Sequence, residues 1–309
     1  MENKQVQFSI LCPTYNRSKL LRRAVESVLK QRFEDFELIV VNDGSTDETR
    51  EVMESFSDNR IVYVEHERNK GINAARNTGY NLARGHYIAL LDDDDELAPY
   101  ALQLALDTFK RVDDQKVKVL FFNCLDVEMT QVSGKLLPEP TIITYVDLLS
   151  QKLKGDYWIV VERSIMPAEK VFDEGSGGAG YTWLRLLQST DAYYSNKVAY
   201  FAYRRHNFAR ITNSRSWQKM EFNAQKLIDE FGEDMKMYCP DIYSKQIAVL
   251  AFYQALNKKI PQARANLFLS LRTRLSPYAV VLLFFTFVSS GSLLLVYRAV
   301  QKHFDTVHF

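Results

Sequence analysis

Hydrophobic residues recur at two alternating spacings over the first 110 positions of the chain. Residues 6–12 form a short apolar run typical of a buried strand, and behind Ser18 the apolar residues recur at helical intervals. A second run at 36–41 precedes Ser45 and Glu48, whose spacing is the capping-box signature of a helix start. The pattern therefore predicts a strand followed by a helix, repeated once.

The alternation continues beyond this repeat. Residues 61–64 and 87–91 are predicted strands, 72–83 is a predicted helix, and a further helix begins at Pro99. Strands that alternate with helices are typical of a parallel sheet with right-handed crossovers and helices on both faces. We therefore predict an α/β fold built on a mostly parallel, Rossmann-like sheet.

Polar residues follow each predicted strand, at the sheet edge where ligands of open α/β sheets bind. The residues after the four strands are Pro13, Thr14, Tyr15, Asn16 and Arg17; Asn42, Asp43, Gly44 and Ser45; Asn69, Lys70 and Gly71, leading to Ala75, Arg76 and Asn77; and Asp92, Asp93, Asp94 and Asp95. An aromatic ring, an arginine and a carboxylate cluster that converge on one edge predict a ligand site there.

The run of four aspartates at 92–95 indicates a metal. Adjacent carboxylates repel and raise each other's pKa unless a cation or a donor group lies among them. Mg²⁺ or Mn²⁺ is usually held by one or two carboxylates together with substrate phosphates. The run therefore predicts a divalent cation site, and the alternative is a solvated acidic turn before the helix at Pro99.

One segment near the C-terminus is apolar enough to meet a membrane. Residues 275–297 carry no charge, and these 23 residues would form a helix about 34 Å long, against a hydrocarbon core of about 30 Å. Serines and a glycine at 289–292 dilute its centre, and basic residues on both sides give no clear charge asymmetry. Spanning the membrane, lying in its plane and packing as a buried core helix all stay open.

The residues ahead of this segment resemble a basic amphipathic helix. Ala263, Leu267, Leu271 and Leu275 recur at intervals of four, whereas Arg264, Arg272 and Arg274 occupy other positions. We therefore expect this stripe to lead into the membrane-associated segment.

Composition excludes several classes of protein. The chain has 309 residues, 47% of them hydrophobic and 25% charged, which rules out disordered and fibrous architectures. Its net charge of +1 gives too little positive electrostatic potential to attract a nucleic-acid backbone, so we expect no nucleic-acid partner.

The cysteines and the N-terminus indicate the compartment. Three cysteines more than 100 residues apart, together with an N-terminus unlike a signal peptide, indicate a reducing compartment and a cytoplasmic location. Dinucleotide oxidoreductases and P-loop enzymes lack support, because GxxxxGKS does not occur and the GxGxxG match at 175–180 does not follow the first predicted strand.

The stretches SILCPTYNR, IVVNDGSTDET, NKGINAARNTG and LLDDDDEL follow one another over about residues 6–100. In this order and spacing they resemble the nucleotide loop, the base-reading segment, the third loop and the Asp-x-Asp metal motif of family 2 glycosyltransferases. That family has the GT-A fold. Beyond residue 110 the resemblance is looser, although TWLRLL at 182–187 and AYRRH at 202–206 are similar to pieces of the acceptor half.

The resemblance implies roles for individual residues. The implied nucleotide-binding residues are Pro13, Tyr15, Asn16, Asp43, Arg76 and Asp93, and the implied ligands of Mn²⁺ or Mg²⁺ are Asp94 and Asp92. Asp43 would accept from the uracil or guanine edge, and Asp93 would face the ribose. The plainer alternatives are a helix N-terminal charge for Asp43, an exposed helical cation for Arg76 and a core aromatic for Tyr15.

The sequence departs from the family at the catalytic base. An inverting transferase needs a carboxylate to take the proton of the acceptor hydroxyl, and in the family an acidic pair commonly stands about one turn before the Leu-Arg-Leu segment. Residues 178–181 are Gly, Ala, Gly and Tyr here. Glu174 is our first candidate, Asp173 the second and Asp191 the third, because the first two lie in a glycine-rich loop that could close over the site. The alternative is that Asp173 and Glu174 cap a surface turn.

The predicted protein is a metal-dependent, inverting glycosyltransferase at the cytoplasmic face of a membrane. It would move a sugar from a nucleotide-diphosphate donor to a lipid-linked or polysaccharide acceptor. We expect a nucleotide-sugar-binding half at 1–115, an acceptor half at 116–215, a helical extension at 216–274 and a membrane-associated helix at 275–302. The alternative is a catalytically silent GT-A-fold membrane scaffold or partner-binding protein. A nucleotidyltransferase is disfavoured, since 13–16 lack a glycine-rich phosphate loop.

Overall fold

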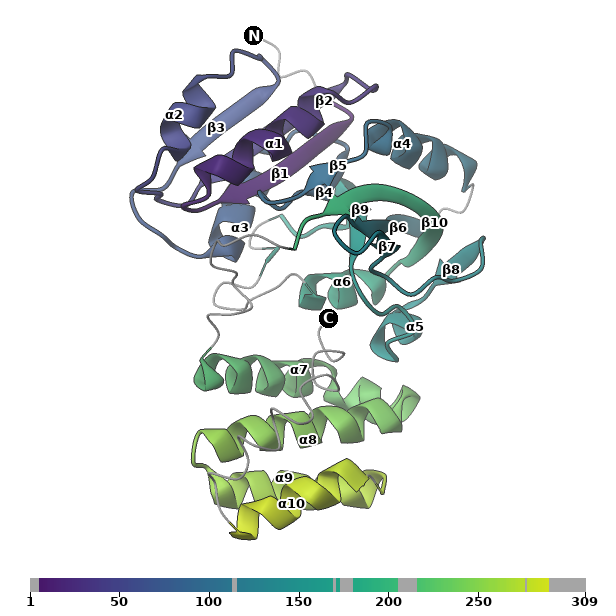
Figure 1. Ribbon diagram of the computed structural model, residues 1–309. Helices are drawn as coiled ribbons and strands as arrows, with labels where there is room; N and C mark the ends of the chain where they lie inside the picture. Colours follow the sequence, from purple (N-terminus) through teal and green to yellow (C-terminus); the bar gives the residue numbers. More distant parts are fainter. Residues whose placement is uncertain are drawn as a thin grey trace. The chain divides into compact units, whose positions relative to one another are not determined.

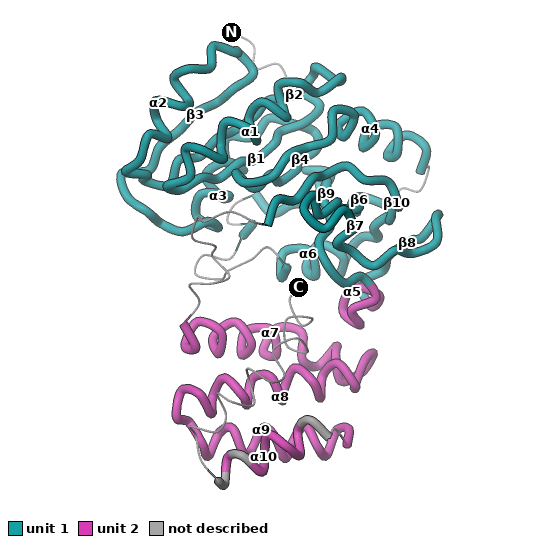
Figure 2. The backbone as a smooth tube through the Cα atoms, viewed as in Figure 1, with its two compact units in different colours: residues 1–145, 153–208 teal, residues 146–152, 209–309 magenta. Residues whose placement is uncertain are grey.

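The computed structural model describes residues 6–112, 116–168, 171–172, 180–204, 216–275 and 277–288 (Figure 1). The chain divides into two compact units (Figure 2). The first comprises residues 1–145 and 153–208, and the second comprises residues 146–152 and 209–309.

A mixed sheet forms the centre of the first unit. Among the described residues its main path runs in the order β3-β2-β1-β4-β9-β6-β10-β5, with β7 beside β6 and β8 beside β10. The strands are β1 (Phe8–Thr14), β2 (Phe36–Asn42), β3 (Ile61–Glu65), β4 (Tyr87–Leu90), β5 (Glu96–Leu97), β6 (Val117–Asp126), β7 (Gln131–Val132), β8 (Thr141–Ile143), β9 (Tyr157–Glu162) and β10 (Asp191–Ala202). Strands β1 to β4, β6 and β10 point the same way, which confirms the predicted α/β fold, while β9 runs antiparallel between β4 and β6.

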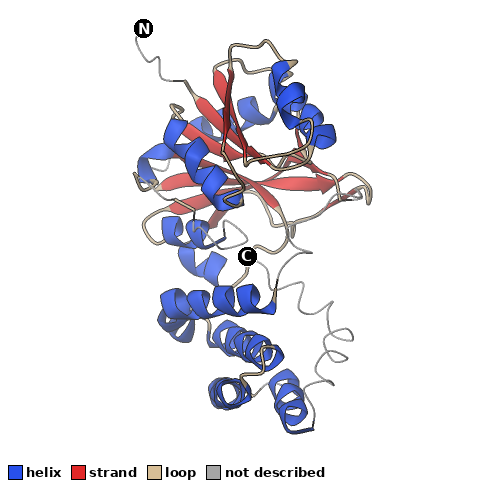
Figure 3. Cartoon of the chain, turned by 90° about the vertical axis from the view of Figure 1, so that its left-hand side faces the viewer, coloured by secondary structure: helices blue, strands red, loops and turns tan. Residues whose placement is uncertain are grey.

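Helices cover both faces of this sheet (Figure 3). They are α1 (Ser18–Leu29), α2 (Thr49–Glu54), α3 (Ile72–Leu82), α4 (Ala101–Arg111) and α6 (Gly180–Leu187), while α5 (Tyr145–Leu149) crosses the boundary between the units and Arg163–Ile165 form a 3₁₀ turn. Alternate side chains of β1 point to opposite faces of the sheet. Ile10 packs in one core cluster with Leu21 of α1, and Leu11 lies against Gly79 of α3. Because β1 is buried on both faces, its sequence is an almost continuous apolar run.

The predicted element boundaries need two corrections. Strand β1 runs through Pro13, a residue that the sequence pattern assigns to the loop; Pro13 stands opposite Val41 of β2. A proline is tolerated there because β4 pairs with β1 only as far as Leu11, so the missing N–H breaks no ladder bond. Helix α2 begins at Thr49, and Ser45 does not form the predicted capping box, since its hydroxyl accepts from the Asn16 backbone instead.

A buried carboxylate joins β1, β2 and the residues before β4 at the edge of the sheet where these parallel strands begin. Glu37 in β2 accepts from the Ser9 hydroxyl at 2.6 Å, and from the Arg84 backbone N–H at 2.6 Å and Nε at 2.8 Å. Glu37→Gln should therefore lower the free energy of unfolding by about 2 kcal/mol, because an amide cannot satisfy all these donors. Urea denaturation measures this, with the exposed Glu54→Gln as control. Equal stability of the two variants would contradict the prediction.

Four helices make up most of the described part of the second unit: α7 (Trp217–Tyr238), α8 (Pro240–Leu256), α9 (Ile260–Thr273) and α10 (Pro277–Val288). Helix α8 is buried along most of its length, and α7, α9 and α10 each pack against it. Figure 2 shows α7 on one side of α8 and α9 with α10 on the other.

The predicted apolar stripe of α9 faces the protein. Ala263 and Leu267 are buried in the core of this unit, and Leu271 packs against the same cluster. Helix α9 is followed by the apolar α10, as expected, and at these three residues the predicted stripe faces the protein core. Of the predicted segment 275–302, the structure describes Leu275 and α10, and none of the described helices has both the length and the hydropathy to cross a membrane.

Candidate active site at the carboxyl ends of the strands

The loops after β1 and β2 are joined through Asn16. Its backbone N–H donates to the Ser45 hydroxyl at 2.9 Å, and its side-chain oxygen accepts from the Thr46 backbone at 2.7 Å. Asn16 has φ 52°, a left-handed conformation that asparagine tolerates better than most residues. The structure thus gives Asn16 a role in shaping the loop, next to Tyr15, whose side chain is 43% exposed. The alternative that Tyr15 is a core aromatic is wrong.

Asp43 joins the loops after β2 and β3. Its carboxylate accepts from the backbone N–H groups of Lys70 at 2.9 Å and Gly71 at 2.8 Å. His66 Nδ1 lies 2.6 Å from the same carboxylate, and His66 Nε2 lies 2.9 Å from the Thr78 hydroxyl. A carboxylate offers about four acceptor positions, so within the described part of the chain one position on Oδ2 remains beyond these three donors. Asp43 is thus held by the loop before α3, with its carboxylate bound to Gly71, the residue that precedes that helix, and not at the start of α2 beside Ser45.

Gly44 allows these two loops to approach closely. Its φ is 73°, and a Cβ at this position would lie 2.5 Å from the carbonyl carbon of Arg68. A larger residue would force the loops apart, because the neighbouring atoms belong to the backbone.

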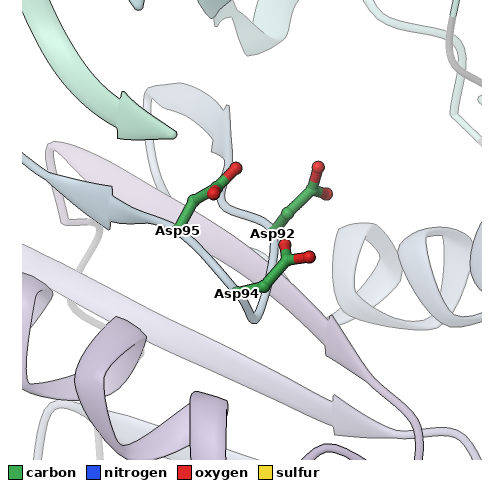
Figure 4. A group of neighbouring side chains, drawn as sticks. All are labelled: Asp92, Asp94 and Asp95. Carbon is green, nitrogen blue, oxygen red and sulfur yellow. The ribbon is translucent and has the colours of Figure 1, made fainter. Parts of the chain in front are cut away.

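Three of the four aspartates gather their carboxylates (Figure 4). Oxygen atoms of Asp92, Asp94 and Asp95 lie within 4.8 Å of one another. Burial, and then the charges of Asp92 and Asp94, raise the pKa of Asp95 to about 8. Asp95 was not among the predicted ligands, although it belongs to the same run.

The carboxylate of Asp93 is not part of this cluster and binds Thr14 and Arg17 instead. Its carboxylate accepts from the Thr14 hydroxyl at 2.7 Å and from Arg17 Nη1 at 2.8 Å, and the same Arg17 nitrogen lies 3.1 Å from Asp94. Burial raises the pKa of Asp93 to about 7 even though Arg17 lowers it. Sequence reasoning gave Arg17 no role, yet it is the cation that holds two carboxylates of the run.

Arg76 lies beside the aspartate cluster. It is buried, so the alternative of an exposed helical cation is wrong. Its Nη2 donates to Asp92 at 3.2 Å and its Nη1 to Asn73 at 3.1 Å, whereas its buried Nε has no hydrogen-bond partner within the described part of the chain. A buried donor of this kind is costly unless a ligand accepts from it.

Two further residues, which sequence reasoning missed, connect the cluster to the end of β10. The Tyr203 backbone N–H donates to Asp95 at 2.8 Å. The guanidinium of Arg23 lies 3.5 Å from the centre of the Tyr203 ring and donates to the backbone oxygen of Asp94. Tyr203 belongs to the AYRRH stretch at 202–206, but no motif links α1 with β10, so the contacts themselves had no signal in the sequence.

The proposed bases Asp173 and Glu174 lie outside the described residues. Phe172, which immediately precedes them, is described, and the side chain of Asn77 binds its backbone through two hydrogen bonds of 2.8 Å. Asn77 follows Arg76 in α3, so the chain up to Phe172 lies beside the candidate site. Asp191 stands at the start of β10, at the opposite edge of the sheet from the aspartates.

Comparison with known proteins finds glycosyltransferases. The family model described as Glycosyl transferase family 2 matches residues 9–150. A Campylobacter jejuni GalNAc(5)-diNAcBac-PP-undecaprenol beta-1,3-glucosyltransferase is 27% identical, over 92% of this chain and 94% of its own length. The Escherichia coli UDP-Glc:alpha-D-GlcNAc-diphosphoundecaprenol beta-1,3-glucosyltransferase WfgD is 32% identical, over 59% of this chain and 70% of its own length.

Solved structures confirm the predicted GT-A fold. Residues 1–349 of TarS from S. aureus, in complex with UDP-GlcNAc, align with a TM-score of 0.63 at 18% identity, covering 98% of this chain and 93% of TarS 1–349. The mannosyltransferase PcManGT from Pyrobaculum calidifontis, in complex with GDP-Man and Mn²⁺, aligns with a TM-score of 0.52 at 18% identity, covering 97% of this chain and 83% of the other.

Proposed function

Because this chain belongs to glycosyl transferase family 2 and is a glycosyltransferase, we propose that it transfers a sugar from a nucleotide-diphosphate donor to a lipid-linked acceptor. The observation that carries the proposal is the meeting of an acidic cluster, Asp92, Asp94 and Asp95, with the buried Arg76 at one sheet edge. The names of both relatives contain an undecaprenyl diphosphate, which supports a lipid-linked acceptor here.

A divalent metal fits the acidic cluster. The three clustered aspartates offer carboxylate oxygen, the ligand type that Mg²⁺ and Mn²⁺ prefer. Asp94 and Asp92 would hold the ion, with Asp95 as an additional carboxylate. A bound cation would neutralise charge on the departing nucleotide diphosphate. The presence of Mn²⁺ with GDP-Man in the PcManGT complex supports a metal here, without bearing on which residues hold it.

The other residues of the site would bind and orient the donor. The free acceptor position of Asp43 would take an N–H of the nucleobase, and the loop contacts of Asp43 would hold it in place for this role. The Nε of Arg76 would donate to a donor oxygen, since it has no hydrogen-bond partner among the described residues. Pro13, Tyr15 and Asn16 would border the nucleoside, and Asp93 would face the ribose.

The reaction would invert the anomeric carbon. In this scheme Glu174, or else Asp173, takes the proton of the acceptor hydroxyl as that oxygen attacks the sugar. A lipid-linked acceptor would place the enzyme at the cytoplasmic face of a membrane, with residues 275–302 in contact with it. These parts of the proposal extend the sequence predictions.

A ligand screen on the full chain tests the donor part. A ligand that binds only the folded protein at a hundred times its Kd stabilises it by about 2.7 kcal/mol, which is a rise in Tm of roughly 5 °C. We expect this rise for UDP- or GDP-sugars when Mn²⁺ is present and a smaller rise in chelator. Transfer to an undecaprenyl diphosphate sugar, with the anomer assigned by NMR, then tests acceptor and inversion.

Two results would count against the proposal. If no sugar nucleotide changes Tm with or without Mn²⁺, the donor site is wrong. If a donor binds but no sugar is transferred or hydrolysed, the silent scaffold becomes the better interpretation.

A further inference from the structure

Helices α9 and α10 present a second apolar face, directed away from α8. The inward residues Ala263, Leu267, Ala279 and Leu282 are buried in the core of the second unit. The exposed residues Phe268, Leu269, Val280, Val281 and Phe284 form what we call the outer face. Phe268 is 52% exposed and Phe284 is 62% exposed. Because α9 and α10 pack against each other, these residues lie on two neighbouring helices, and exposed apolar residues that gather in this way mark sites of interaction.

The charge around the outer face has one sign. No acidic residue occurs between Asp241 and Asp305, whereas Lys258, Lys259, Arg264, Arg272 and Arg274 accompany α9. The acidic residues of the described helices in this unit lie on α5 (Asp147), on α7 and at Asp241, and α7 packs on the other side of α8 (Figure 2). Glu221 of α7 still reaches Lys259 at 2.8 Å, so Lys259 adds no net charge to the outer face. Arg274 pairs with Asp241 at 2.8 Å, so Arg272 is the arginine at this end of α9 that would meet an anionic partner.

We propose that the outer face of α9 and α10 binds the surface of an anionic lipid bilayer. Phe268 and Phe284 would enter the boundary between headgroups and acyl chains, and Arg272 would meet lipid phosphates. A second copy of the chain fits less well, since a symmetric contact would bring the same basic residues together. The inference rests on the proposed membrane location and assigns it to a particular surface, the side of α9 opposite the stripe read from the sequence.

Vesicle flotation of the full chain tests this surface. We expect binding to vesicles of phosphatidylglycerol with phosphatidylcholine, weaker binding at 0.5 M salt and little binding to phosphatidylcholine alone. The double variant F268S/F284S should partition at least about tenfold less, because two exposed aromatic rings no longer enter the bilayer. F222S is the matched control, since Phe222 is 55% exposed on α7. R272Q/R274Q should lose the preference for phosphatidylglycerol.

The outcomes separate this inference from the proposed function. The vesicles contain no acceptor, and the donor-induced rise in Tm, measured on the same samples, should be the same in wild type and all variants. The inference is overturned if wild type does not float, or if F268S/F284S floats like F222S. It is also overturned if wild type is a dimer that F268S/F284S dissociates without any effect on flotation, because the face would then join two copies.

Discussion

Replacing Asp94 by asparagine is expected to lower kcat by about a thousandfold and to abolish the effect of Mn²⁺ on nucleotide affinity. The amide keeps the size of the side chain but removes the charge that a divalent cation needs. Asp94 is buried within the acidic cluster and lies 3.1 Å from Arg17, so the substitution also removes one of the carboxylate charges beside Arg17.

Steady-state kinetics and calorimetric titration of the nucleotide, each with Mn²⁺ and with chelator, measure these two effects. Asp107→Asn is the control, since Asp107 is an exposed aspartate of α4. Wild-type turnover in the Asp94 variant, or undiminished turnover in excess chelator, would show that the cluster holds no catalytic metal.

Local periodicity predicted the first four strands and their helices, because each strand is a run of mostly apolar residues that is buried, as in β1 and β2, or half-buried, as in β3. It could not place β9, whose neighbours β4 and β6 are far from it in the chain. The partner of a strand depends on the topology, and apolar periodicity carries no such information. Strand β5 has two residues, too few to show any period.

The sequence placed the four aspartates at the right edge, but not their directions. In an extended chain Asp92 and Asp94 would share one side and Asp93 the other; in the structure Asp92 and Asp94 do cluster, but Arg17 Nη1 contacts both Asp93 and Asp94. The same alternation would place Asp95 on the side of Asp93. The chain turns here instead, with the Asp95 N–H donating to the Asp92 carbonyl at 3.1 Å, and the Asp95 carboxylate joins those of Asp92 and Asp94. The direction of Arg17 was equally hidden, because it follows the left-handed Asn16.

The apolar stripe of α9 shows a second limit of prediction from sequence periodicity. A period of four identifies an amphipathic helix, but a protein core and a membrane both accept an apolar face. Packing against α8 places Ala263 and Leu267 in the protein core, whereas Phe268 is exposed. Exposure, which only the structure supplies, was needed to find the outer face.

The catalytic base is the remaining proposal that rests on the sequence, and the described residues around it give it support. Phe172 precedes Asp173 and is bound to Asn77, and the Arg76 guanidinium lies 6.0 Å from the Phe172 ring. The same guanidinium donates to Asp92. The chain therefore reaches Asp173 and Glu174 from beside the residues proposed to hold the donor.

Glu174→Gln is expected to lower kcat by at least about a hundredfold, because a positioned proton acceptor contributes roughly 10² to 10⁴ in rate. Nucleotide affinity should not change, since this group would touch the acceptor and not the donor. Asp173→Asn should have the smaller effect. Asp191→Asn is the control, because Asp191 stands at the far edge of the sheet, opposite Val117 at the start of β6. If the Glu174 and Asp173 variants both keep wild-type kcat, the proton leaves through another group and the glycine-rich loop does not carry the base.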